Sequence, residues 1–191
     1  MVPRINRAAF SGAAGDEHRL LNRANVGVLR AALTPEFIEW RPPQVADFAR
    51  LVGTARYAPS QSQDSVLADL RRLLDELEAE YPGLKARVYP QEPARSGLAM
   101  LPFEVSRRAP VVQALNRAYE QVRQAPQPTG AVRPMCFYWT DAAHLQHRAG
   151  LEGVVCGPGG RYNTMPDERV DVADYLDAIR IYMLAILDIC A

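Results

Sequence analysis

The sequence predicts an α/β (α+β) protein made of two small units. Residues 64–80 place apolar side chains at helical spacing, and alternating segments typical of strands flank them at 45–56 and 84–89. Two short apolar runs bounded by turn residues, 135–139 and 153–156, are typical of buried strands. The chain has 191 residues, 48% of them hydrophobic and 23% charged, which is enough to fold around a core without disulfide or metal cross-links.

The first unit is expected to span residues 1–92. Residues 25–32 are predicted to form a further strand, and residues 34–43 an extended connection interrupted by prolines. Asp64 is the expected N-cap of the helix at 64–80, and the Pro-Gly pair that follows ends this helix. A strand, a helix and a strand therefore succeed one another, which predicts a small α+β layer.

The second unit is expected to span residues 93–191, because the periodicity gives way to Pro, Gly, Ser and Gln across residues 90–102. Pro110 suits the first turn of a helix, whose apolar stripe ends before Pro126. A last helix is predicted to start near Asp171 and to continue almost to the end of the chain.

The charge balance excludes some classes of partner. The 22 basic residues offset the 22 acidic ones, so no overall field attracts a polyanion, and we expect neither a nucleic-acid nor a membrane partner. The apolar run at 182–190 is far shorter than a bilayer span, and residues 1–7 are not followed by the apolar segment of a secretory signal. The three cysteines lack the close pairing of a zinc or redox site, which favours free thiols and a cytoplasmic location.

Histidines are too few for a conventional metal motif. The chain has three, and neither H-E-x-x-H nor H-x-D occurs; the serine-nucleophile and nucleotide-binding motifs are also missing. His144 and His147 would share one helical face if Asp141 caps a helix there. They are either surface or structural histidines or, together with Asp141, a single metal site.

Two segments have the residue types of a binding site. A glycine-rich turn begins at Gly157, directly after the apolar run at 153–156, and such a turn can present backbone N–H groups to an anionic ligand or simply reverse the chain. Thr140 and Asp141 follow another apolar run, at a strand end where α/β folds build sites.

Taken in order, these segments resemble one family. Four segments look like the C-terminal end of that family. They are the Trp-Thr-Asp-Ala-Ala-His-Leu run at 139–145, the Val-Val-Cys-Gly-Pro-Gly turn at 154–159, the Met-Pro-Asp-Glu-Arg-Val segment at 165–170 and the final helix. The family is that of the dinuclear zinc amidohydrolases, metallopeptidases that include acetylornithine deacetylase, succinyl-diaminopimelate desuccinylase, aminoacylase and carboxypeptidase G. The first ninety residues are similar to its ferredoxin-like lid, the peptidase dimerisation domain, with residues 53–59 matching the strand-end arginine motif.

The resemblance implies substrate contacts rather than catalytic or metal residues. The expected substrate-binding residues are Arg56, Thr140, Asp141, Gly157, Pro158 and Gly159. Arg56 would bind a substrate carboxylate through its guanidinium fork, or is otherwise an exposed strand-end arginine. Gln44 stands where the family often has a polar lid residue.

The resemblance also implies a zinc-ligand histidine after the turn, and Thr164 stands there instead. Asp167, Glu168 or Asn163 substitutes for it, or the second metal is bound differently or not at all. No catalytic residue and no metal ligand is therefore assigned to this chain.

The implied function is the C-terminal half of a zinc-dependent amidohydrolase, a hydrolase that cleaves the amide bond of N-acyl amino acids or small peptides. The family's H-x-D motif, bridging Asp and Glu pair are not found in this sequence, so we expect the isolated chain to be inactive and to bind no zinc alone. The expected partners are a second copy paired through the lid, an N-terminal half of the enzyme and a small substrate. The alternative is a non-catalytic dimerisation or binding module derived from that family.

Overall fold

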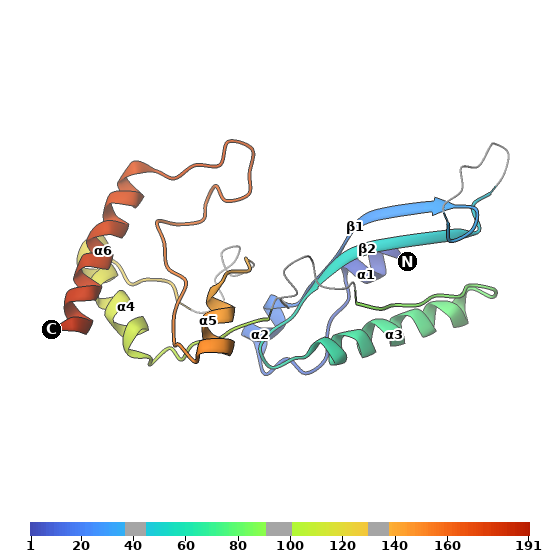
Figure 1. Ribbon diagram of the computed structural model, residues 1–191, viewed down its shortest axis with the longest axis horizontal. Helices are drawn as coiled ribbons and strands as arrows, with labels where there is room; N and C mark the ends of the chain where they lie inside the picture. The colour runs from blue at the N-terminus through green and yellow to red at the C-terminus, as the bar shows by residue number, and fades with distance from the viewer. Residues whose placement is uncertain (37–44, 91–100, 130–137) are drawn as a thin grey trace. The chain divides into compact units, whose positions relative to one another are not determined.

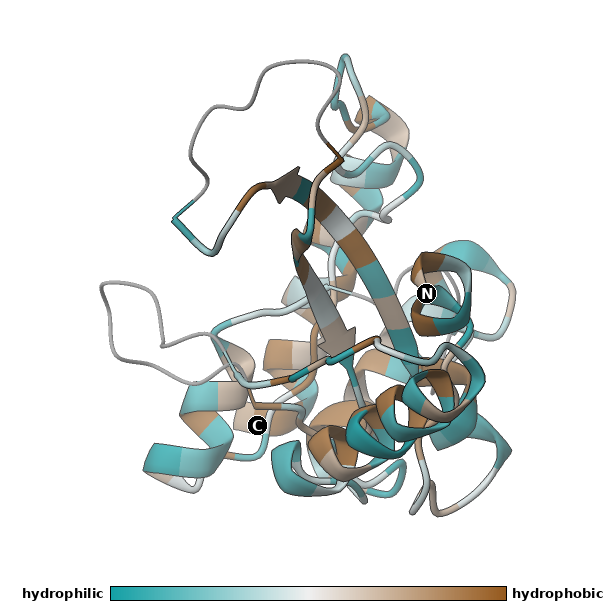
Figure 2. Cartoon of the chain, turned by 90° about the vertical axis from the view of Figure 1, so that its right-hand side faces the viewer, coloured by the Kyte–Doolittle hydropathy of each residue, from teal (hydrophilic) through white to brown (hydrophobic). Residues whose placement is uncertain are grey.

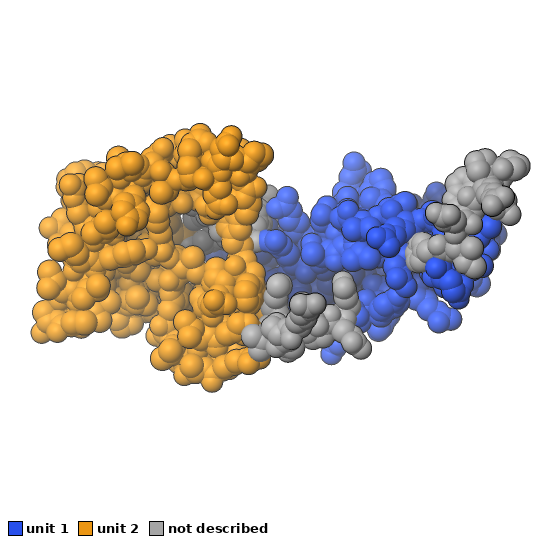
Figure 3. Space-filling model, turned by 45° about the horizontal axis from the view of Figure 1, so that its top comes forward, with its two compact units in different colours: residues 1–92 blue, residues 93–191 orange. Residues whose placement is uncertain are grey.

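The computed structural model describes residues 1–36, 45–90, 101–129 and 138–191. The chain divides into two compact units, Met1–Glu92 and Pro93–Ala191 (Figure 3). The predicted α/β class is confirmed, because a two-stranded antiparallel sheet and several helices make up these residues (Figure 1). None of the helices in the described ranges is long and apolar enough to cross a membrane.

The first unit is built on a hairpin of β1 (Arg23–Ala32) and β2 (Phe48–Arg56). The strands pair from Arg23 opposite Arg56 to Ala32 opposite Phe48, with a bulge between Val26 and Val28. Both predicted strands are confirmed, although β2 begins at residue 48 rather than 45. Hydrophobic and hydrophilic residues form bands along the hairpin (Figure 2), but only Ala24 and Ala32 of its two strands are buried.

Gly53 allows the two strands to approach closely. A Cβ at this position would lie 2.2 Å from the carbonyl oxygen of Asn25 on the partner strand, a distance that no side chain tolerates. A Cβ at Gly27, within the bulge, would meet nothing within 4 Å apart from its own chain neighbours. Gly53 is therefore required by strand pairing, whereas Gly27 is not.

Helix α3 (Gln63–Glu80) is the longest element of this unit and buries Val66, Leu74 and Leu77. The helix was predicted, but its expected N-cap was wrong. Ser62 is the N-cap: its hydroxyl accepts from Ser65 N–H and Ser65 Oγ accepts from Ser62 N–H, both at 3.1 Å. Asp64 instead lies in the first turn, where its charge suits the helix dipole.

Two short helices that the sequence did not predict precede the hairpin, α1 (Val2–Asn6) and α2 (Asp16–Leu21). His18 lies in α2, and its Nδ1 is 2.9 Å from Ser60 Oγ. Between these helices, the chain around Phe10 packs against Ala24 and Val66 in a small core.

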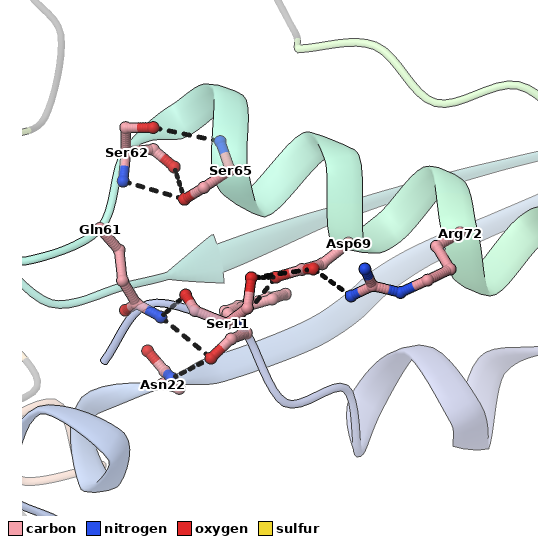
Figure 4. A network of polar contacts seen from close by, with 8 residues as sticks. Ser11, Asn22, Gln61, Ser62, Ser65, Asp69 and Arg72 are labelled. Carbon is pink, nitrogen blue, oxygen red and sulfur yellow. Dashed lines mark hydrogen bonds and ion pairs between the residues drawn. The ribbon is translucent and has the colours of Figure 1, made fainter. Parts of the chain in front are cut away.

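A buried carboxylate fixes this N-terminal segment to α3 (Figure 4). Asp69 is 7% exposed and accepts from Ser11 N–H at 2.7 Å and from Ser11 Oγ at 2.9 and 3.1 Å. Arg72, one turn further along α3, donates to the same carboxylate. Gln61 Nε2 donates to the Phe10 and Ser11 carbonyl oxygens at 3.1 and 2.8 Å, so the segment is held at adjacent residues.

Two predicted strands are not formed, and a third lies mostly outside the described residues. Residues 84–89 lie outside any helix or strand, and Ala86 N–H donates to Glu78 Oε1 at 2.5 Å instead of joining a ladder. Residues 153–156 and the described end of the 135–139 run, residues 138–139, are also irregular. Other expected features lie outside the described residues: residues 135–137, Gln44, Cys136, and most of the segments 34–43 and 90–102.

The second unit contains α4 (Pro110–Arg123), α5 (Ala142–Ala149) and α6 (Val172–Cys190). The predicted helices at 110 and 171 are confirmed, each within a residue or two. Small and branched side chains of α4 and α6 form one core, against which Val154 and Cys156 also pack: Ala114, Leu115, Ala118, Ile181 and Ala185. Small residues let the two helices approach closely, and this pair is the main packed layer of the unit.

Candidate functional site

Arg56 is the last residue of β2 and is exposed. The register places Arg23, the first residue of β1, directly opposite, so two arginines meet across the end of the hairpin. No salt bridge joins Arg56 to a carboxylate within the described ranges of the chain. The guanidinium fork of Arg56 is suited in charge and geometry to an anion that reaches this end of the hairpin. Arg23 could not be identified from the sequence, because the register of a hairpin depends on its turn and its bulge.

Thr140 and Asp141 form the N-terminus of α5. Asp141 occupies the N-cap position, but its carboxylate makes no capping hydrogen bond; Thr140 Oγ1 accepts from Ala142 N–H at 3.1 Å instead. The helix was expected on the condition that Asp141 caps it, and the Thr140 hydroxyl performs that role. The exposed Asp141 side chain is left available to a ligand.

The turn at Gly157–Gly159 is held from α6. Tyr182 on α6 donates its hydroxyl proton to the Cys156 carbonyl oxygen at 2.6 Å, and Gly159 adopts a left-handed φ of +103°. The Cys156 side chain is half-buried beneath the turn, and burial raises the pKa of its thiol. The strand expected before the turn is missing, but the turn itself is fixed to the helical core.

A shallow hollow lies directly after this turn. It is lined by Pro158, Gly159, Arg161, Tyr162, Arg169, Val170, Asp171 and Asp174. The guanidinium of Arg169 stacks over the Tyr162 ring at 3.9 Å, and that of Arg161 lies 5.6 Å from the same ring. Sequence reasoning did not select these two arginines, and their charges are matched in the lining by those of Asp171 and Asp174.

Two carboxylates at the N-terminal end of α6, one of them on its N-cap residue Asp171, hold Arg161 in place. Its Nη2 is 2.8 Å from Asp174 Oδ2 and 3.1 Å from Asp171 Oδ2. The other oxygen of Asp174 accepts from Arg123 Nη2 on α4 at 2.7 Å. The Arg123 hydrogen bond is the main reason that the pKa of Asp174 is lowered. Asp174 is therefore a carboxylate shared by α4 and by the segment after the turn.

The histidines of α5 do not converge. His147 Nε2 is 2.7 Å from the Pro102 carbonyl oxygen, whereas the His144 ring packs edge-on against Trp139 at 5.3 Å and neither of its nitrogens has a hydrogen-bond partner. Nowhere in residues 1–36, 45–90, 101–129 and 138–191 do three or more His, Cys, Asp or Glu side chains form a group that could hold a metal ion. The described donors thus do not fit a zinc ion, and no chemical step of this chain is assigned to one.

Two residues that follow the turn have backbone angles that are uncommon outside glycine. Thr164 and Asp167 both adopt left-handed φ values, of 58° and 59°. Asp167 and Glu168, two of the residues considered above as substitutes for a missing histidine ligand, belong to no group of three or more His, Cys, Asp or Glu side chains in the part of the chain that is described. Arg56 lies in the first unit and the other predicted substrate contacts lie in the second.

Comparison with known proteins places these features in a family. The family profile described as Peptidase family M20/M25/M40 matches residues 37–188. The fold is similar to that of an M20 family metallo-carboxypeptidase from Sulfolobus solfataricus, with a TM-score of 0.53 and 19% sequence identity. The match covers 99% of this chain and 43% of that one, so the chain spans less than half the length of the solved structure. No curated protein matches the sequence.

Proposed function

The chain belongs to peptidase family M20/M25/M40, and from this we propose that it is the lid and C-terminal section of a zinc-dependent amidohydrolase whose substrates are N-acyl amino acids or small peptides. Within the family, the deacetylases, desuccinylases and carboxypeptidases of the acetylornithine deacetylase type are the proposed relatives. We place it in the cytoplasm.

The observation that carries this proposal is the exposed Arg56 at the end of the hairpin. Arg56 is exposed and lies opposite Arg23, and Arg56 makes no salt bridge in the described residues. A guanidinium fork matches a carboxylate in geometry and charge, and N-acyl amino acids and peptides all end in a carboxylate. Arg56 is thus suited to hold the substrate's invariant carboxylate while the rest of the substrate is free to differ.

Catalysis by the chain alone is not part of the proposal. Amide hydrolysis at a metal needs several converging ligands and a general base to activate the bound water, and no such ligand group exists in the described residues. The role proposed for these residues is to bind and orient the substrate for a centre formed by other residues.

Carboxylate binding at Arg56 tests the proposal. N-acetylglycine is titrated into the labelled chain, and the side-chain Nε–H resonance of Arg56 is followed by NMR. We expect it to shift in the wild type and no shift with N-acetylglycinamide, which lacks the charge. Arg56→Ala should abolish binding. Arg30→Ala should not, although Arg30 also lies opposite an arginine, Arg50, in the same hairpin.

An activity assay completes the test. Release of amino groups from N-acetyl amino acids and dipeptides should stay at background for the chain supplied with Zn²⁺. Turnover that depends on the metal would contradict the proposed division of roles and would show a complete catalytic centre. Absence of carboxylate binding at Arg56 would favour the second candidate, a non-catalytic binding module, for which the exposed Val28 and Leu29 of the hairpin offer a pairing surface.

A further inference from the structure

Residues 1–15 form a segment that we call the strap, and it attaches to the rest of the first unit at few points. The strap lies outside the matched family profile, which begins at residue 37. Helix α1 buries none of its residues, and the chain from there to α2 is alanine and glycine apart from Arg7, Phe10 and Ser11. Phe10 is the only buried residue of the strap, whose other apolar side chains are partly buried or exposed.

The apolar attachment of the strap is a small core near the start of α3. Phe10 packs there against Ala24 of β1 and Val66 of α3, and we call these three residues the strap core. Leu74 and Leu77 are buried further along α3 and are not part of the strap core. Helix α3 therefore has buried contacts of its own that do not involve Phe10.

Hydrogen bonds to side chains supply the polar attachment on the α3 side (Figure 4). Asp69 of α3 accepts from Ser11 N–H at 2.7 Å, and Gln61 donates to the Ser11 carbonyl oxygen at 2.8 Å. In the loop before α3, Ser60 Oγ accepts from Ala14 N–H at 3.0 Å. The amide protons of Ser11 and Ala14 are thus bonded to side chains of a neighbouring element, and they stay protected from water only while the strap is attached.

One amide of the hairpin also depends on the strap. Val26 N–H, at the bulge of β1, donates to Asn6 Oδ1 at 2.9 Å. The strap core includes Ala24, and its partner across the hairpin, Ala55, is next to Arg56 in β2. The strap therefore borders the strand end that carries Arg56, the residue proposed to bind the substrate carboxylate.

We propose that the strap opens as one unit while β1, β2 and α3 stay folded. Segments that bury few apolar side chains and depend on a few hydrogen bonds open more readily than the core elements of a native protein. Opening exposes one buried phenylalanine and removes the hydrogen bonds of the strap to Gln61 and Asp69, a smaller change than unfolding α3 with its buried leucines. It also removes packing from Ala24, at the strand end that carries Arg56. The inference does not depend on the substrate proposed for Arg56.

Hydrogen exchange of the backbone amides in the full native chain, followed by NMR, tests the proposal. The amides of Ser11, Ala14 and Val26 should have protection factors at least about tenfold lower than amides in the second half of α3, and these should depend little on urea, because a small opening exposes little surface. Val26 distinguishes this opening from fraying of the N-terminus, since it belongs to β1 and its amide is bonded to the strap. Its protection should follow that of Ser11 and Ala14.

Leu77→Ala separates opening of the strap from unfolding of the whole unit. In the proposed opening Leu77 stays buried, so this variant should lower protection in α3 by roughly 30-fold or more and leave that of Ser11, Ala14 and Val26 unchanged. Leu77→Val, a smaller change, gives the same comparison if the alanine variant fails to fold. Phe10→Ala is the matched variant inside the strap core, and it should lower protection of the strap amides by at least about 100-fold.

Three results would overturn the proposal. Equal loss of protection in the strap and in α3 for Leu77→Ala would show that the strap opens only when the whole unit unfolds. Protection of Val26 that follows its neighbours in β1 would show that the opening does not extend to Asn6. Absence of protection at Ser11 in the wild type would show that Asp69 does not hold the strap closed.

Discussion

Asp69→Asn is expected to destabilise the first unit by about 2–3 kcal/mol, because hydrogen bonds to a buried charged group each contribute about 1.5–3 kcal/mol. Asp69 is 7% exposed and accepts from Ser11 N–H and from the Ser11 hydroxyl, which lies within reach of both carboxylate oxygens, so the neutral amide must keep the same neighbours with one oxygen fewer. For a unit of this size, the loss corresponds to roughly 10–20 °C in Tm. Urea unfolding of the full chain, followed by circular dichroism, measures the difference.

Arg72→Ala is the matched control for this variant. The Arg72 side chain is 65% exposed, so its ion pair with Asp69 is screened by solvent and its removal should cost no more than about 1 kcal/mol. If Asp69→Asn and Arg72→Ala destabilise the chain equally, the buried hydrogen bonds from Ser11 contribute nothing beyond the ion pair, and the reasoning is refuted.

The pH dependence of the same variant supplies a second check. Burial alone would raise the pKa of Asp69, but the hydrogen bonds from Ser11 and the charge of Arg72 outweigh it and lower this pKa. The unfolded chain therefore takes up a proton first as the pH falls, and the stabilisation is complete above the unfolded-state pKa of about 4. It is lost as the pH falls through the native pKa. The difference between wild type and Asp69→Asn should shrink below about pH 4, and a difference independent of pH would contradict this.

Three further outcomes are expected. Gly53→Ala should destabilise the hairpin by at least about 2 kcal/mol, because its Cβ would meet a backbone carbonyl oxygen. Gly27→Ala should change the free energy of unfolding by less than about 0.5 kcal/mol. Similar effects of the two variants in urea titrations would count against the close approach of the strands at Gly53. Tyr182→Phe should speed hydrogen exchange of the backbone amides in the turn after Cys156 by roughly tenfold, because one hydrogen bond of about 1 kcal/mol is lost. Unchanged exchange rates would show that contacts other than the Tyr182 hydroxyl hold the turn. Asp174→Asn should lower Tm at pH 7 and should reduce the loss of stability that the wild type shows below about pH 4, as expected for a carboxylate whose pKa is lowered in the folded state. An unaltered acid unfolding transition would exclude Asp174 as a source of that loss.

The sequence was sufficient for elements that carry their own periodicity. The stripe of α3 and the proline at the start of α4 located both helices, and alternation located β2. Alternation failed at residues 84–89, because a strand also needs a neighbour to pair with and Ala86 N–H bonds to Glu78 instead. Helices α1 and α2 have five and six residues, too few for a periodic pattern to be visible.

The candidate site was predictable where a motif contained it. Arg56 lies at the strand end that its motif predicted, but its neighbour Arg23 is 33 positions away in sequence and is placed by the register alone. Thr140, rather than Asp141, caps α5 through its hydroxyl, a difference that depends on backbone angles and not on residue type. The assignment of these residues to substrate binding stays a prediction.

Asp174 makes two parts of the second unit depend on one proton. One of its oxygens accepts from Arg123 of α4 and the other accepts from Arg161, which follows the glycine turn. Protonation of this carboxylate, or loss of either arginine, would therefore weaken the helix pair and the rim of the hollow together. Order in the loop is in this way coupled to the integrity of the helical layer, so the two should melt as one cooperative unit rather than in separate steps.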